Sequence, residues 1–295
     1  MILAGQLRAR VAVTHGQRLL VRTAEGLELP ARPAQRRLRP VCGDWVRVEQ
    51  DPQHDELRVL EVEPRSGTLY RSNARGAGEL IAANLTLLLV VLAPEPKPDL
   101  FITDRYLCAA RSAGIDALVV LNKCELADEG LRTELAAFTA AGYRCLEVSA
   151  LHATGMTQLR ASLAGHTAML VGQSGTGKSS LLRALLPEAQ ALVGSLARDR
   201  TGRHTTTSTR LYVLADGAEL LDSPGVRDFA PAIAQLTGAT LGFLEVERAA
   251  DNCRFSNCRH MQEPDCAVRA HMNARRYESY RRLRRLCERL SVSWQ

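Results

Sequence analysis

Residues 172–180 read GQSGTGKSS, and this stretch decides the fold. It matches the pattern G-x-x-x-x-G-K-[ST] in full, follows the apolar segment Ala168 to Val171 and precedes a helical pattern. A strand, a glycine-rich turn and a helix in this order form a phosphate-binding loop, whose backbone N–H groups face the phosphates. We expect Lys178 to contact the β and γ phosphates and Ser179 to bind Mg²⁺. The predicted loop comprises Gly172, Gln173, Ser174, Gly175, Thr176, Gly177, Lys178, Ser179 and Ser180.

The segments around this loop alternate between apolar strands and helical patterns, which is typical of a parallel sheet covered on both faces. Strands are predicted over residues 85–92, 118–121, 144–148 and 168–171, and helices over 100–113, 131–141, 156–163 and 178–186. Residues 210–214 and 219–221 predict a hairpin that turns at Asp216-Gly217.

Asn122-Lys123-Cys124-Glu125 directly follows a predicted strand and resembles the N-K-x-D box with which GTPases read guanine. A carboxylate there can accept both the N1 and N2 hydrogens of guanine, a donor pair that adenine lacks. After the strand at 144–148, Ser149-Ala150 resembles the serine-alanine box that completes the base pocket.

Two further motifs predict the magnesium and γ-phosphate contacts. Asp222-Ser223-Pro224-Gly225 places a carboxylate at a strand end, with the Gly225 amide directed toward the γ phosphate. The polar loop from Gly202 to Thr207 contains Thr206, a candidate magnesium ligand. Valine follows the D-x-x-G motif and cannot orient water, so His204 is the candidate for that role.

The order of these motifs along the chain is unusual. The guanine box and the serine-alanine box come before the phosphate loop, and the threonine loop and D-x-x-G follow it. Ordinary GTPases begin with the phosphate loop. The sequence therefore predicts a circularly permuted GTPase domain over residues 73–233.

Residues 1–72 contain five short alternating strands, which predict a small barrel. An OB-type barrel, whose face and loops commonly hold nucleic acid, is favoured over an SH3-like barrel by the strand count.

At the other end of the chain, residues 234–295 are predicted to be helical. Three thiols and one imidazole there form a Cys₃His set that predicts one structural zinc, bound by Cys253, Cys258, His260 and Cys266.

Charge and composition restrict the class of protein further. Residues 1–75 carry 13 basic and 9 acidic side chains and residues 234–295 carry 11 and 7, so both ends are basic. Such ends are typical of contact with a polyanion, and the arginine-rich helix near residues 275–289 is expected to present a basic outer face. No segment has the length of a membrane span or the pattern of a signal peptide, so we expect a cytoplasmic protein that does not bind membranes.

Together the barrel, the permuted GTPase motifs and the Cys₃His knuckle resemble the ribosome small subunit-dependent GTPase family, RsgA. The resemblance implies a monomer that binds GTP or GDP with Mg²⁺, binds the 30S subunit and its 16S rRNA, hydrolyses GTP when stimulated by that subunit, and acts in late 30S maturation. One departure concerns Glu125, because the family usually has aspartate there. Two alternatives stay open: a zinc-bearing RNA-binding module whose nucleotide site is structural, and a P-loop ATPase or kinase.

Overall fold

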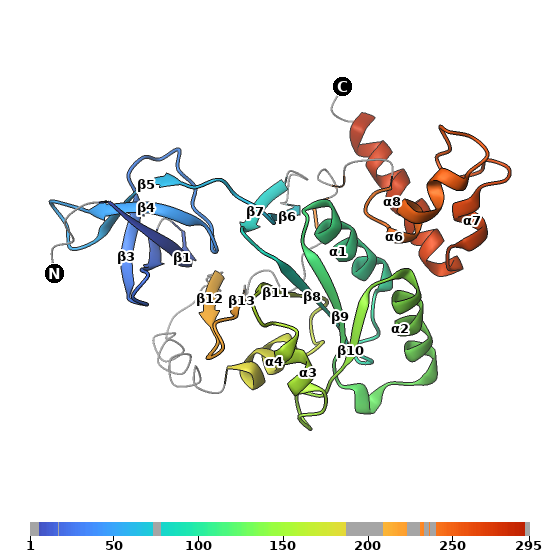
Figure 1. Cartoon of the computed structure of the whole chain (residues 1–295), viewed down its shortest axis with the longest axis horizontal. Helices are drawn as coiled ribbons and strands as arrows, with labels where there is room; N and C mark the ends of the chain where they lie inside the picture. The colour runs from blue at the N-terminus through green and yellow to red at the C-terminus, as the bar shows by residue number, and fades with distance from the viewer. Residues whose placement is uncertain are drawn as a thin grey trace.

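The computed structural model describes residues 6–16, 18–72, 78–186, 209–222, 231–232, 236 and 240–292. A β-barrel, an α/β sheet and a helical C-terminal region follow one another along this part of the chain (Figure 1). The predicted fold class is therefore confirmed. None of the helices in the described ranges combines the length and the apolar character that crossing a membrane requires.

The N-terminal barrel is built from five strands. They are β1 (Leu7–His15), β2 (Arg18–Arg22), β3 (Glu28–Pro33), β4 (Trp45–Gln50) and β5 (Leu57–Val62). Their order is β1-β2-β3-β5-β4, and the pairing of β4 with β1 closes the barrel. Alternate residues such as Val11, Val21 and Val48 fill the interior, because successive side chains of a strand lie on opposite faces. The closed order agrees with the predicted OB-type barrel.

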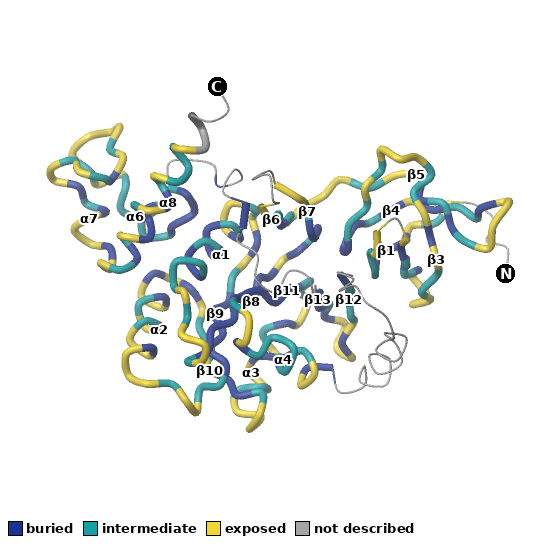
Figure 2. The backbone as a smooth tube through the Cα atoms, turned by 180° about the vertical axis from the view of Figure 1, so that it is seen from behind, coloured by how far each residue is buried: buried dark blue, intermediate teal, exposed yellow. Residues whose placement is uncertain are grey.

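The α/β sheet has four neighbouring parallel strands at one end. They are β8 (Leu87–Leu92), β9 (Asp116–Leu121), β10 (Arg144–Glu147) and β11 (Thr167–Val171). One face of the sheet packs on α1 (Leu100–Ser112) and α2 (Glu129–Ala141), and the other on α3 (Met156–Ala161) and α4 (Lys178–Leu185). Val90 therefore shares a core with Phe138, whereas its neighbour Val91 shares the opposite core with Leu159. Because both faces are covered, β8 is buried along its whole length (Figure 2).

Two hairpins complete the strands. The predicted hairpin is present as β12 (Thr209–Val213) and β13 (Glu219–Asp222), with β13 parallel to β11. The second hairpin, β6 (Leu69–Ser72) and β7 (Gly78–Ala82), was not predicted, since its short strands lack a clear alternation of apolar and polar residues.

The barrel and the α/β sheet are joined by one continuous sheet. Strand β1 of the barrel pairs antiparallel with β12, so that Val13 lies opposite Arg210. Beside this pairing, the buried guanidinium of Arg10 lies 2.9 Å from the Glu219 carboxylate, which also accepts a hydrogen bond from the Thr167 hydroxyl. These contacts connect the first residues of β11 and β13 to the barrel.

The C-terminal region packs on α1 through a buried arginine. This region contains α6 (Leu244–Ala249), α7 (Ala267–His271) and α8 (Ala274–Val292). Arg276 of α8 is 0% exposed and pairs with Asp104 of α1 and Glu245 of α6. Burial opposes its charge, but the hydrogen bonds of Glu245 and the charge of Asp104 outweigh burial and raise the pKa of Arg276. The expected basic outer face of α8 is thus wrong for this arginine, which faces inward.

Replacing Arg276 with methionine should destabilise the protein strongly. The substitution fills the space, but it leaves the Glu245 carboxylate without its cation and leaves Asp104 with Arg275 alone. Breaking a buried ion pair typically costs about 3–5 kcal/mol. The midpoint of urea denaturation, followed by the helical circular dichroism signal, measures this loss. Arg285→Met, at an exposed position of the same helix, is the matched control and should stay within about 0.5 kcal/mol. Equal midpoints for the two variants would contradict the role of Arg276.

Candidate nucleotide site and metal centre

The predicted nucleotide motifs meet at one edge of the sheet although they are dispersed along the chain. The phosphate loop follows β11, the guanine box follows β9, and the serine-alanine box comes shortly after β10. These strands run parallel, so their carboxyl ends lie at the same edge. Asp222 ends β13, which is parallel to β11, and so reaches this edge too. Ligands of open α/β sheets bind at such an edge.

The phosphate loop depends on glycines at its start and end. Gly172 has φ +136°, and a Cβ there would lie 2.3 Å from the backbone oxygen of Val91. Gly177 has φ +88° and caps α4, which begins at Lys178. The Lys178 ammonium donates to the backbone oxygens of Gly172 and Gln173, both at 2.6 Å. The loop and helix N-terminus present backbone N–H groups and an ammonium, which suits an anionic phosphate chain.

Asn122 joins the guanine box to the phosphate loop. Its buried side-chain amide donates to the backbone oxygen of Thr176 at 2.9 Å and accepts from the backbone N–H of Ala150 at 3.2 Å. Lys123 lies in the left-handed region at φ +57°, and its ammonium donates to the backbone oxygens of Glu95 and Gly175. One dipeptide therefore holds the three predicted elements of the pocket together.

Glu125 lies just after β9 in η1 (Cys124–Leu126), a short 3-10 turn. A hydrogen bond from its own backbone N–H, followed by contributions from the Ser149 hydroxyl and the neighbouring His152 and Lys123, lowers the pKa of this carboxyl. The group is thus held ionised, the state that can accept two N–H donors. Cys124 donates its backbone N–H to Val148 at 3.1 Å, which links the turn to the start of the serine-alanine loop.

Several predicted site residues lie outside the described part of the chain. These are His204, Thr206 and Gly225, together with the rest of the threonine loop and most of the D-x-x-G motif. Sequence reasoning missed one described residue near the site, His152. Its Nε2 lies 4.0 Å from Glu125 Oε1 and comes from the loop after β10. The available signal for His152 was its place two residues after the serine-alanine box. The predicted Gln173 accepts the backbone N–H of Asp99 at 3.0 Å with its side-chain oxygen.

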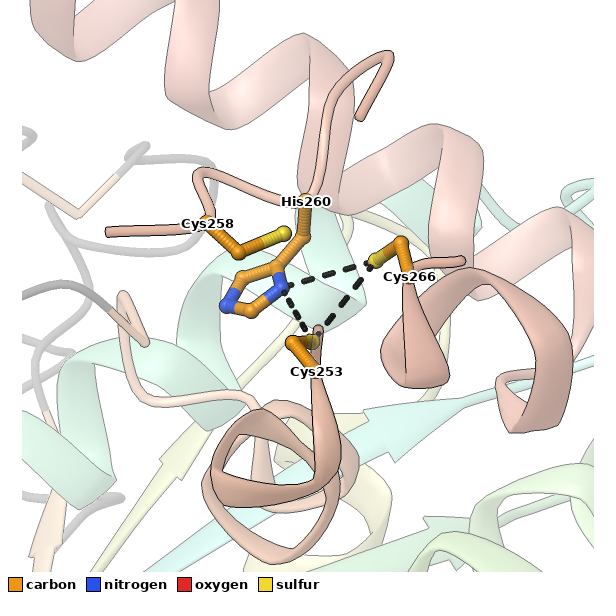
Figure 3. Close-up of side chains that lie close together, drawn as sticks. All are labelled: Cys253, Cys258, His260 and Cys266. Atoms are coloured by element: carbon orange, nitrogen blue, oxygen red, sulfur yellow. Dashed lines mark hydrogen bonds between the residues drawn. The ribbon is translucent and has the colours of Figure 1, made fainter. Parts of the chain in front are cut away.

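The four predicted metal ligands form one cluster (Figure 3). Cys253 Sγ lies 3.4 Å from His260 Nδ1 and 4.0 Å from Cys266 Sγ, and His260 Nδ1 lies 3.6 Å from Cys266 Sγ. Bonds of about 2.3 Å to sulfur and about 2.0 Å to nitrogen give tetrahedral edges of about 3.5–3.8 Å, so the set fits a zinc ion. Burial lowers the pKa of His260, which favours the neutral imidazole that binds metals.

The ligand loop is held from α8 and from within. Tyr277 of α8 donates its hydroxyl to the backbone oxygen of His260 at 3.1 Å, and Tyr280 donates to that of Arg259 at 3.0 Å. Inside the loop, the Glu263 carboxylate accepts backbone N–H groups from Arg259, Met261 and Gln262. Although burial opposes ionisation, these bonds lower the pKa of Glu263 to about 2. The ligands are therefore held at fixed positions by partners that the cysteine spacing does not reveal.

The RsgA GTPase family model matches residues 62–231. The chain belongs to the RsgA GTPase family. The small ribosomal subunit biogenesis GTPase RsgA of Chromohalobacter salexigens is 44% identical over 234 residues, which cover 76% of this chain and 69% of that protein. The protein of the same name from Azotobacter vinelandii is 42% identical and covers 77% and 68%.

Two crystal structures share the fold. YjeQ from Thermotoga maritima superposes with a TM-score of 0.71 at 24% identity, over 94% of this chain and 96% of that one. YloQ, described as a circularly permuted GTPase, gives a TM-score of 0.70 at 18% identity, over 97% and 96%. The permutation predicted from the motif order is therefore confirmed.

Gly177→Ala should weaken the binding of guanine nucleotides by about 10- to 100-fold. The added Cβ would lie 2.2 Å from Asn122 Nδ2, so the amide must leave Thr176, and the loss of a buried hydrogen bond costs about 1–3 kcal/mol. Calorimetric titration with GDP measures the change. Gly165→Ala is the matched control, because Gly165 also has a positive φ but has nothing within 4 Å of the added Cβ. Similar GDP affinities for both variants would show that Asn122 does not organise the site.

Proposed function

We propose that the protein binds the 30S ribosomal subunit through its 16S rRNA, hydrolyses GTP when this subunit stimulates it, and assists late maturation of the subunit. The observation that carries the proposal is the bridge from Asn122 to Thr176 and Ala150, since it joins a guanine-type box to a phosphate loop. A P-loop ATPase or kinase does not need this box. The names of the RsgA relatives, which specify small ribosomal subunit biogenesis, support the choice of partner.

The proposed roles follow the positions of the side chains. The N–H groups of residues 172–180 and the Lys178 ammonium hold the phosphates, and Glu125 accepts the paired donors of guanine. Ser149 and Ala150 complete the base pocket, with Lys123 and Cys124 beside it. Ser179, Thr206 and Asp222 are the proposed ligands of Mg²⁺, which neutralises charge on the β and γ phosphates when bound. Gly225 donates its amide to the γ phosphate, and His204 orients the attacking water.

The flanking regions are proposed to hold the rRNA. The proposed domains are an OB-type RNA-binding barrel over residues 1–72, the GTPase over 73–233 and a zinc-binding helical domain over 234–295. Arg282 and Arg285 of α8 have exposed side chains that can exchange their counterions for rRNA phosphates. We further propose that the protein acts as a monomer in the cytoplasm.

GTP turnover with and without purified 30S subunits tests the proposal. We expect stimulation by 30S but not by 50S subunits, and no comparable turnover of ATP. In single-turnover reactions on saturating 30S subunits, His204→Ala should lower the rate by about 10²- to 10⁴-fold with GTP affinity nearly unchanged, since a positioned acid or base contributes this much. Absence of stimulation would contradict the proposed function, whereas a parental rate for His204→Ala would remove only that residue from the mechanism.

The Cys₃His cluster is proposed to bind one structural zinc ion through all four protein ligands, which leaves no position for a substrate water. We expect one zinc per chain in protein purified without chelators, and none in Cys266→Ser. That variant should also show faster hydrogen exchange in α8, because Tyr277 and Tyr280 bind the ligand loop, while GDP binding stays measurable. The control variant Cys287→Ser removes a thiol outside the cluster, and it should still contain one zinc per chain. Much less than one zinc in the parent protein would refute this site.

A further inference from the structure

We infer that His152 is a positioning residue of the base site, which holds the carboxylate of Glu125 where guanine is read. The inference rests on the proposed guanine specificity and adds a residue to it. His152 Nε2 lies 4.0 Å from Glu125 Oε1, and the two side chains come from different loops, after β10 and after β9.

A glutamate at this position needs support that an aspartate does not. Its carboxylate is carried by one more rotatable bond, and each side-chain torsion that must be fixed on binding has an entropic cost. The carboxylate must also present two oxygens in one plane to the paired donors of guanine. A neighbour that holds the carboxylate before the base arrives lowers the cost of binding, which is the general effect of preorganisation.

The position of His152 is itself fixed by the loop that carries it. Its backbone N–H donates to the buried Ser149 hydroxyl at 3.1 Å, and Ser149 forms an isolated bridge with Thr154. Gly155 closes the turn at φ +69°, where a Cβ would lie 2.4 Å from the Glu147 backbone oxygen. The loop is therefore packed against the end of β10, and the imidazole is held on the side of Glu125.

Neighbouring cations are bonded to other groups. The Lys123 ammonium donates to the backbone oxygens of Glu95 and Gly175, and Arg132 donates to the Glu147 carboxylate at 3.4 Å. The imidazole edge and the Ser149 hydroxyl face the Glu125 carboxylate instead. Since the His152 side chain is 58% exposed and that of Glu125 29%, the pair lies at the mouth of the site, where an arriving base would shield it from water.

A double-mutant cycle on the full chain tests the inference. His152→Ala should weaken GDP binding by about three- to tenfold, the order expected for a partly exposed contact to a carboxylate, and leave ADP binding unchanged. His152→Gln, which keeps a donor near the Nε2 position, should stay within about twofold of the parent. In a Glu125→Asp background, His152→Ala should have less than about a twofold effect, because the shorter side chain withdraws the carboxylate from the imidazole.

The controls separate this inference from the proposed function. Leu151→Ala, at an exposed position of the same turn, should leave GDP affinity at the parental value and reports on damage to the loop. Equal losses from His152→Ala in both backgrounds, or no loss in the parent, would overturn the positioning role. If the parent protein bound GDP and ADP equally, the guanine specificity itself would fail. If the parent protein clearly preferred GDP but the His152 variants bound GDP with the parental affinity, only the inference would be rejected.

Discussion

The amide side chain of Asn122 is the contact on which the nucleotide site depends. It is buried between three chain segments, and it donates to Thr176 and accepts from Ala150. In the permuted chain these segments are separated by up to 54 residues, and the guanine box precedes the phosphate loop. The parallel sheet brings their ends to one edge, but only a side chain with both a donor and an acceptor can fix them to one another. The order of the motifs along the chain is permuted, yet one side chain still joins the three segments at the pocket.

Two buried arginines attach the flanking regions, and they differ in how completely their donors are paired. Arg276 meets two carboxylates, whose interactions outweigh burial and raise its pKa. Arg10 meets one, Glu219, and burial lowers the pKa of this guanidinium, whose Nε has no hydrogen-bond partner. Since a buried charge is costly unless its donors are satisfied, the helical region is held by the more complete ion-pair network. The barrel relies in addition on the main-chain pairing of β1 with β12.

Much of this architecture could be predicted because its signals are local. The strands β8 and β11 are apolar on both faces, and the glycines and Lys178 of the phosphate loop have a fixed spacing. The remaining features arise from contacts between distant segments. The sequence of a basic helix does not indicate that Arg276 will be buried and paired with Asp104, which lies far earlier in the chain. Likewise, the proximity of His152 to Glu125 depends on how two loops after neighbouring strands turn, which no periodicity describes.

The continuous sheet has a mechanical consequence. A domain that is attached only by a linker can rotate about a few single bonds. Turning this barrel would instead break its two residue pairs with β12 and separate Arg10 from Glu219. Strand β12 pairs in turn with β13, which ends at Asp222. A displacement of the barrel would therefore be transmitted through β12 to β13. The barrel and the strand that leads to Asp222 are therefore joined by main-chain hydrogen bonds across β12 and not by a linker alone.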